Sequence, residues 1–142
     1  MAAEINQNPR QSIDDLVQKT GSKTGFHIEH ILSHNEENLA LFDGDEERFE
    51  VERNRLGGIL LLKGRDNISS NNEPYRDKLR SYDNTLYWNE TLREDFYKSK
   101  LDFREMQVRH DLGLYPMPDQ FGPEELEQRH KWLFQIASII WR

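Results

Sequence analysis

The alternation of apolar and polar residues predicts strands in the first half of the chain and helices in the second. Residues 25–32 alternate as a strand that enters a buried site would, and the glycine-bounded apolar run at 56–64 predicts a second, well-buried strand. The polar and acidic segment between them, residues 33–52, predicts a long loop with one helical turn around 39–42.

Four other segments carry helix signals, and proline in a first turn marks two of the helix starts. The first predicted helix has Ser12 as its N-cap and ends at Gly21, and the second covers residues 70–82, with Asn72 as its cap and Pro74 in its first turn. The third runs from Trp88 to Asp111, and the fourth runs from Glu124 to Trp141, after Pro123. The proline-rich stretch 114–123 predicts a connector. We therefore expect one α+β domain, in which a small two-stranded element and a helix are supported by further helices.

The composition narrows the possible chemistry. The chain has no cysteine, which excludes disulfide scaffolds, thiolate zinc sites and a cysteine nucleophile. Any bound metal would be held by His, Asp, Glu or Asn, which favours hard or borderline ions. The first residues lack a secretory signal, and no apolar run approaches the roughly 18 residues needed to span a bilayer. We expect a cytoplasmic protein without a membrane segment.

The net charge of −7 argues against a nucleic-acid partner, but the charges are unevenly distributed. Residues 31–52 contain eight acidic residues and one basic residue, which is typical of a solvated face. Residues 53–80 contain seven basic residues and three acidic ones. We therefore expect any phosphate binding to come from the second segment.

The stretch FHIEHILSHN at 26–35 places His27, Glu29, His30 and His34 among apolar residues. A neutral imidazole is suited to act as a general base, because its unperturbed pKa of about 6.5 lies near working pH. A carboxylate and an amide oxygen are ligands that Mg²⁺ accepts, and it keeps several waters. A phosphodiesterase would need such a base, a cation on the phosphate, and a group that orients the base.

Four segments of the chain resemble a known protein family. The segments IEHIL (28–32), NRLGGILLL (54–62), DNISSNNEPYRDKL (66–79) and ELEQRHKWLFQIASIIW (125–141) are similar to the HNH nuclease domain at the C-terminal end of GmrSD-like and SspE-like restriction proteins. The resemblance implies a ββα-metal core of a two-stranded antiparallel sheet and a helix. On this basis residues 1–24 form a tail with a short helix, 25–82 the core, and 83–142 a helical support within the same domain.

The resemblance assigns roles residue by residue. His30 resembles the general base, and Glu29 resembles a ligand of Mg²⁺ or Mn²⁺. Asn54 resembles the central asparagine, which steadies the histidine by hydrogen bonding, and Asn67 resembles the third position, which completes the metal site. The chain departs from the family in having Ser33 and His34 where proline and often glutamine are common, and LGG at 56–58 where LGN is usual.

Contact with DNA is expected from basic and amide side chains of the segment 53–80. Two of these, Asn71 and Lys78, resemble family positions where phosphate contact is expected, and Lys78 would act as a point charge. The full set of expected DNA-binding residues is Arg53, Arg55, Lys63, Arg65, Asn71, Arg76 and Lys78. His34 is a candidate additional ligand, whereas His27 shares a strand face with residue 29 and is expected only to neighbour the site.

The resemblance implies a metal-dependent DNA endonuclease that nicks double-stranded phage DNA in bacterial defence. One such site cuts one strand, so a double-strand break would need repeated nicking or a dimer. The chain has no glycine-rich phosphate-binding motif, so nucleotide-dependent sensing would belong to an N-terminal domain that relatives carry and this chain lacks.

Two other functions remain open at this point. The domain could be a catalytically inactive DNA-sensing or interaction module on the nuclease scaffold. Alternatively, His27, His30 and His34 could form a structural zinc site, although this set lacks a fourth ligand and leaves Asn54 and Asn67 unexplained.

Overall fold

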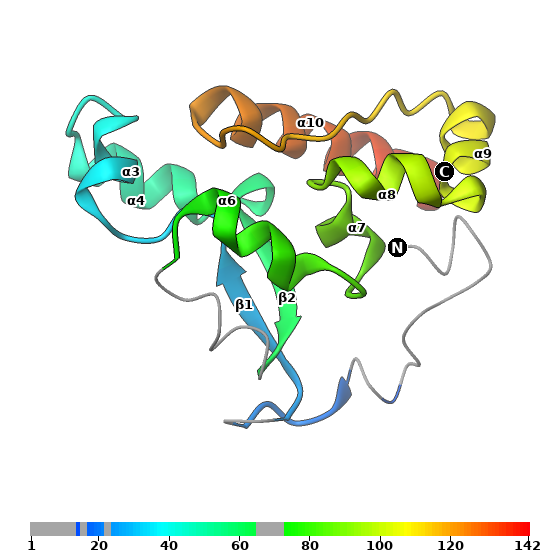
Figure 1. Ribbon diagram of the computed structural model, residues 1–142, viewed down its shortest axis with the longest axis horizontal. Helices are drawn as coiled ribbons and strands as arrows, with labels where there is room; N and C mark the ends of the chain where they lie inside the picture. Colours follow the sequence, from blue (N-terminus) through cyan, green and yellow to red (C-terminus); the bar gives the residue numbers. More distant parts are fainter. Residues whose placement is uncertain (1–13, 15–16, 22–23, 65–72) are drawn as a thin grey trace.

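The computed structural model describes residues 14, 17–21, 24–64 and 73–142. Two antiparallel strands, β1 (Phe26–His30) and β2 (Ile59–Lys63), form the sheet of this part of the chain. Both predicted strands are confirmed, and each lies within the range that the sequence pattern indicated. The strands lie side by side in Figure 1, and helices gather around one end of the hairpin.

The two faces of the hairpin have different surroundings. Glu29 of β1 stands opposite Leu60 of β2, and both side chains are buried. On the other face Ile28 stands opposite Leu61, and these side chains are 59% and 43% exposed. Because side chains alternate along a strand, one face packs against the core and carries Glu29 with it.

The segment 33–52 was expected to be a loop, and this expectation is wrong. It contains two helices, α3 (Glu36–Ala40) and α4 (Glu46–Arg53). The side chain of Asn35 caps α3 and that of Asp45 caps α4, each accepting a hydrogen bond from a backbone N–H of the first turn. Acidic residues stand in both first turns, where negative charge favours a helix. The acidic block, which was expected to be a solvated face, therefore includes the first turns of two helices.

Two aromatic side chains anchor these short helices to the core. Phe42 follows α3 and Phe49 lies on α4; both are fully buried, with ring centroids 5.3 Å apart. Gly44 adopts a left-handed backbone with φ 74° between the helices, a conformation that glycine takes without strain. The chain between the strands is thus a packed unit that brings residue 54 back to the end of β1.

The predicted helix at 70–82 is confirmed in part as two short elements, α6 (Tyr75–Lys78) and η2 (Leu79–Tyr82). Pro74 immediately precedes α6, as the proline signal indicated. The expected cap Asn72 lies outside the described residues. Side chains of both elements reach Glu29 on β1, so this part of the chain covers the buried face of the hairpin.

The long helix expected from Trp88 to Asp111 is also wrong. The structure has three short helices there, α7 (Tyr87–Glu90), α8 (Glu94–Ser99) and α9 (Leu101–His110). Lys100, with φ −102° and ψ 94°, is extended and separates α8 from α9. The break lets the rings of Phe96 and Phe103 pack across it in a tilted arrangement, with centroids 4.5 Å apart. The two rings pack against each other across the break, so the segment does not form the one continuous amphipathic helix that was expected.

The last predicted helix is confirmed as α10 (Pro123–Ile140), and the preceding connector at 114–123 is not helical up to Pro123. α10 packs on the short 3-10 turn η1 (Leu56–Gly58), and Figure 1 shows it passing above the hairpin and α7. A Cβ atom on Gly57 would lie 2.4 Å from the carbonyl oxygen of Leu126, so only glycine permits this close approach. No helix in the described ranges is long and apolar enough to cross a membrane.

Candidate active site

The end of β1 and the end of α4 bring His30 and Asn54 together. Nε2 of His30 lies 2.8 Å from Oδ1 of Asn54, across a separation of 24 residues. Asn54 is the residue that ends α4, and the helix places its side chain beside the half-buried imidazole. The resemblance implied a hydrogen bond of this kind between the central asparagine and the histidine, and this contact is present.

The surrounding hydrogen bonds define the tautomer of His30. Nδ2 of Asn54 lies 2.7 Å from the carbonyl oxygen of Glu50, which can only accept, so the amide is oriented with Oδ1 toward the imidazole. An amide oxygen also only accepts, and Nε2 of His30 must therefore carry the hydrogen. In the neutral ring the lone pair is then on Nδ1, and this is the nitrogen that can take a proton.

Glu50 organises the side chains around this contact. Its carbonyl binds Asn54, while its carboxylate accepts from Arg53 at 3.2 and 3.3 Å. Nε of Arg53 donates to the carbonyl oxygen of Leu32 at 3.1 Å and so ties α4 to the segment after β1. Glu50 was not predicted as a site residue, although it stands four residues before Asn54 on one helix face, the spacing that signals such a contact.

Glu29 lies on the other face of β1, in a buried ionic cluster. Oε1 of Glu29 accepts from Nζ of Lys78 at 2.8 Å and from the hydroxyl of Tyr82 at 3.3 Å. Lys78 and Glu29 are only 1% and 3% exposed. The ammonium also donates to the backbone carbonyl of His30 at 2.7 Å. Tyr82 was not predicted as part of the site, but it stands four residues after Lys78, a spacing that places both on one helix face.

Burial determines the protonation behaviour of this cluster. Desolvation lowers the pKa of the Lys78 ammonium, and the neighbouring carboxylate of Glu29 opposes that effect. Desolvation also raises the pKa of the Tyr82 phenol well above its ordinary value, and the charge of Glu29 raises it further. At neutral pH the hydroxyl of Tyr82 is therefore a hydrogen-bond donor to the carboxylate.

The described residues do not by themselves fit a divalent cation. The carboxylate of Glu29, the expected ligand, is already engaged by an ammonium group and a hydroxyl. No group of three His, Cys, Asp or Glu side chains that could hold a metal ion occurs in the described ranges. Asn67, the other expected ligand, lies outside the described residues.

The three histidines of the stretch 26–35 are not gathered into one site. Nε2 of His27 lies 2.7 Å from the carbonyl oxygen of Gly21. Nε2 of His34 faces the carboxylate of Glu50 at 3.4 Å, and His30 faces Asn54. Each histidine has a different partner, so the zinc alternative has no support in this geometry.

The residues expected to bind DNA are also dispersed. Lys78 is buried and Arg53 is only 13% exposed, so these two side chains stabilise the fold from inside. Arg55 pairs with Glu52 and Glu127, both at 2.8 Å, and these hydrogen bonds raise its pKa. The remaining expected residues are Lys63 at the end of β2, Arg76, whose side chain is 69% exposed, and Arg65 and Asn71, which lie outside the described residues.

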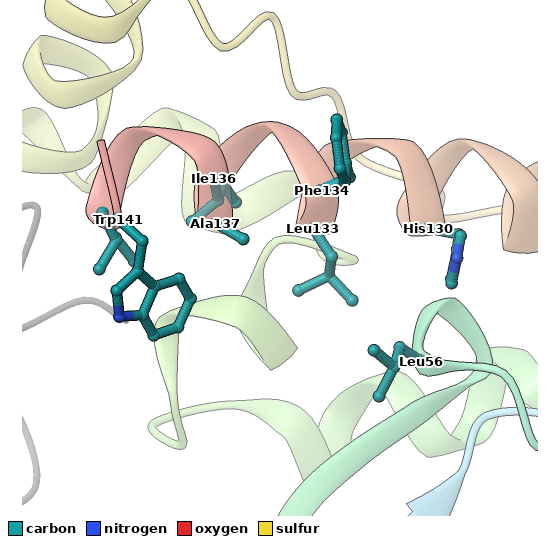
Figure 2. Close-up of a pocket in the computed structure, with 8 residues that line it drawn as sticks. Leu56, His130, Leu133, Phe134, Ile136, Ala137 and Trp141 are labelled. Carbon is teal, nitrogen blue, oxygen red and sulfur yellow. The ribbon is translucent and has the colours of Figure 1, made fainter.

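A separate apolar groove of about 410 Å³ lies between η1 and α10. Figure 2 shows Leu56 below the helix, facing Leu133, with His130 at one end and Trp141 at the other. None of the residues to which the resemblance assigns a role in catalysis or metal binding lines this groove. Apart from His130 its lining is apolar, so the groove suits apolar side chains.

The comparisons with known proteins agree with the sequence resemblance. The model of the family described as "GmrSD restriction endonucleases, C-terminal domain" matches residues 2–136. No curated protein and no solved structure matches the chain. Because the family match includes β1, α4 and β2, it covers both His30 and Asn54. The chain belongs to the family of C-terminal domains of the GmrSD restriction endonucleases.

Proposed function

We propose that this domain is an HNH-type endonuclease that hydrolyses phosphodiester bonds of double-stranded DNA, with His30 as its general base. The hydrogen bond between Nε2 of His30 and Oδ1 of Asn54 carries the proposal, because it holds the ring in one tautomer and leaves Nδ1 to take a proton. Membership of a restriction endonuclease family supplies the reaction class and the DNA substrate.

The reaction that this arrangement supports is hydrolysis by an activated water. Nδ1 of His30 takes one proton from the water while its oxygen bonds to phosphorus. The bond between phosphorus and the 3′ oxygen breaks, and that oxygen takes a proton from solvent. The products are a 3′ hydroxyl and a 5′ phosphate at a nick. Asn54 keeps the imidazole in position throughout and takes no proton itself.

Dependence on Mg²⁺ or Mn²⁺ is part of the proposal and rests on the family alone. A bound cation would supply charge neutralisation at the phosphate. The carboxylate of Glu29 is engaged by Lys78, and the described residues do not assemble a donor set for a cation. The cation requirement is therefore tested directly, with EDTA and a panel of divalent ions.

The decisive experiment measures nicking of supercoiled plasmid by the wild type, His30→Ala and His110→Ala. Removing a general base lowers the rate by about 10²–10⁴-fold, and His30→Ala is expected to lose activity on that scale. His110, on the last turn of α9, controls for the loss of an imidazole elsewhere. Circular dichroism and thermal melting establish that each variant is folded.

Undiminished cutting by His30→Ala would refute the role of His30. DNA binding by the wild type without any cutting, across the whole metal panel, would instead favour an inactive DNA-sensing module. The engaged state of Glu29 is the observation that keeps this second function in consideration. Phage DNA in a bacterial cell, a separate sensor domain and a dimeric state for double-strand breaks remain proposals from the family resemblance.

A further inference from the structure

The hydrogen-bond pattern of the hairpin leaves the carbonyl group of His30 on the outer edge of β1. The backbone N–H of Ile31 donates to the carbonyl of Gly58 at 3.0 Å, and that of Gly64 donates to Gly25 at 3.3 Å. In an antiparallel pair the bonded residues alternate with non-bonded ones. His30, opposite Ile59, is therefore a non-bonded position, and its carbonyl points away from β2.

Lys78 supplies the hydrogen bond that the sheet does not. Its Nζ lies 2.7 Å from the carbonyl oxygen of His30. The same ammonium is held at 2.8 Å from Oε1 of Glu29 on the neighbouring residue of β1. A lysine that binds two successive residues of one strand restrains the backbone at the point where the strand ends. The imidazole of His30 projects from that same backbone.

The burial of Lys78 separates this contact from a contact with DNA. Its side chain is 1% exposed, so the ammonium does not reach a phosphate in solution. Lys78 is the last residue of α6, which covers the buried face of the hairpin. The side chain therefore acts inside the protein, on the strand that carries the proposed base.

We propose that Lys78 is a positioning residue for His30, acting through the backbone carbonyl of that residue and itself held by Glu29. The proposal rests on the proposed function of His30 as the general base. A positioning role for Lys78 predicts a loss of catalytic rate that a lysine with a purely structural role would not cause. Removal of the ammonium lets the end of β1 relax, and the imidazole loses its fixed geometry against Asn54, whereas DNA binding is unaffected.

The test is single-turnover nicking of supercoiled plasmid by Lys78→Met over a range of enzyme concentrations in excess of DNA. The maximal rate is expected to fall by about 10- to 100-fold, because misplacement of about an ångström costs this much in a catalytic site. The half-saturating enzyme concentration is expected to stay unchanged. ¹⁵N NMR of the ring nitrogens of His30 is expected to show loss of the single Nε2–H tautomer.

Two further variants keep the test interpretable. Phe103→Leu removes buried volume in the aromatic cluster with Phe96, and it is expected to lower stability without changing the maximal rate or the His30 ring signals. If Lys78→Met does not fold because Glu29 is left unpaired, the double variant Glu29→Gln/Lys78→Met removes that charge. The double variant is expected to keep the same ring defect, because the bond to the His30 carbonyl is still absent.

Three results would overturn the proposal. The first is wild-type ring signals in folded Lys78→Met, or in the double variant if the single variant does not fold. The second is an unchanged maximal rate with weaker DNA binding, which would indicate a phosphate contact. The third is an equal loss of rate in Phe103→Leu, which would indicate stability alone. If the wild type does not cut DNA, the proposed function fails, and the NMR measurement still decides whether Lys78 positions His30.

Discussion

Oδ1 of Asn54 accepts a hydrogen bond from Nε2 of His30 at 2.8 Å, and this contact joins the end of a helix to the end of a strand. The two side chains meet because α3 and α4 return the chain to β1 before β2 begins. The amide of Asn54 is itself oriented by the carbonyl of Glu50, so the direction of Oδ1 is determined independently of its contact with the imidazole. An asparagine at this position therefore selects one histidine tautomer without adding a charge.

Replacing Asn54 with leucine is expected to lower the rate of plasmid nicking by about 10- to 100-fold, part of the 10²–10⁴-fold that a general base contributes. Leucine has a similar size but cannot accept from Nε2, so the ring samples both tautomers and more than one orientation. Asn54→Asp keeps the acceptor and is expected to retain more activity than Asn54→Leu. Nicking at saturating protein measures all of these rates.

Asn38→Leu is the matched control for this change. Asn38 also donates from its amide to a backbone carbonyl, that of Ser33 at 2.8 Å, but it has no contact with the imidazole. Its loss is expected to reduce stability by about 1 kcal/mol, the net value of a typical hydrogen bond, with little effect on rate. Equal losses of rate in Asn38→Leu and Asn54→Leu would contradict the role given to Asn54.

The buried pair of Glu29 and Lys78 is expected to respond differently to single and double replacement. Lys78→Met leaves a carboxylate buried without its cation, and breaking a buried pair in this way costs about 3–5 kcal/mol. Glu29→Leu/Lys78→Met removes both charges and is expected to recover most of that loss, since a buried pair is often no more stable than apolar residues of similar volume. Urea unfolding of the three proteins at pH 7 measures the difference.

The hydroxyl of Tyr82 provides the control for this cycle. Tyr82→Phe removes only the donor at 3.3 Å from Glu29 and leaves the ion pair in place. We expect it to lower the free energy of unfolding by much less than Lys78→Met does. A double variant as unstable as Lys78→Met would show that the lysine contributes by packing and by its bond to the His30 carbonyl, independently of the charge on Glu29.

The strands were predictable because glycines and an apolar run define them locally, and the last helix because an apolar stripe and Pro123 mark it. The helices between the strands were missed, because their apolar content is small. α3 has no buried residue and α4 has one, Phe49. Their stability comes from caps and from that aromatic anchor, which a periodicity pattern does not reveal. The local signals were the capping residues Asn35 and Asp45 and the acidic residues of the two first turns.

The pairing of His30 with Asn54 followed from the family resemblance, whereas the position of Lys78 did not follow from the sequence. A lysine in a basic segment is expected to be exposed at the surface, because lysine is rarely buried unless it is paired. Its partner Glu29 is 49 residues away, and only the fold brings the two together. The break between α8 and α9 was equally hidden, since the contact between the rings of Phe96 and Phe103 is a tertiary contact.

The close contact between η1 and α10 predicts a strong effect of a single methyl group. A Cβ on Gly57 would lie 2.4 Å from the carbonyl oxygen of Leu126 and 2.8 Å from the backbone nitrogen of His130. Neither backbone atom can move without displacing α10. Gly57→Ala is therefore expected to lower the free energy of unfolding by about 1–3 kcal/mol or more, the usual range for overpacking.

Gly122→Ala is the matched control for Gly57→Ala. Gly122 has φ −138°, which any residue can adopt, and a Cβ there would meet its nearest atom at 3.5 Å, an ordinary contact. We expect a loss of about 0.5–1 kcal/mol, because alanine is a poorer helix N-cap than glycine. Similar thermal melting of the two alanine variants would show that η1 and α10 are not in direct contact.

Buried phenols predict a loss of stability in alkali. Desolvation raises the pKa of Tyr75, Tyr82 and Tyr97 above the ordinary value of 10.0. Above pH 10 the unfolded chain loses these protons while the folded chain keeps them. The stabilisation is therefore complete below pH 10 and decreases as the pH rises, by about 1.4 kcal/mol per pH unit for each phenol.

Two buried cations act in the opposite direction over part of this range. Desolvation lowers the pKa of Arg129 to about 10 and also lowers that of Lys78. For a base with a lowered pKa, the unfolded state holds its proton longer, so stability increases with pH up to the unfolded value. Three phenols outnumber these two groups, and Lys78 contributes only up to its ordinary pKa of 10.5. The net expectation above pH 10.5 is a decrease.

Tyr97→Phe isolates one phenol from this balance. Its hydroxyl donates to the carbonyl of Thr91 at 2.9 Å, so the variant is expected to lose about 1 kcal/mol at pH 8. Between pH 10.5 and 11.5 its free energy of unfolding should fall less steeply than that of the wild type, by about 1.4 kcal/mol per pH unit. Tyr115→Phe is the control, because this side chain is 52% exposed and reaches solvent whether or not the chain is folded. Identical pH slopes for the wild type and Tyr97→Phe in urea unfolding would show that the Tyr97 phenol is not buried as described.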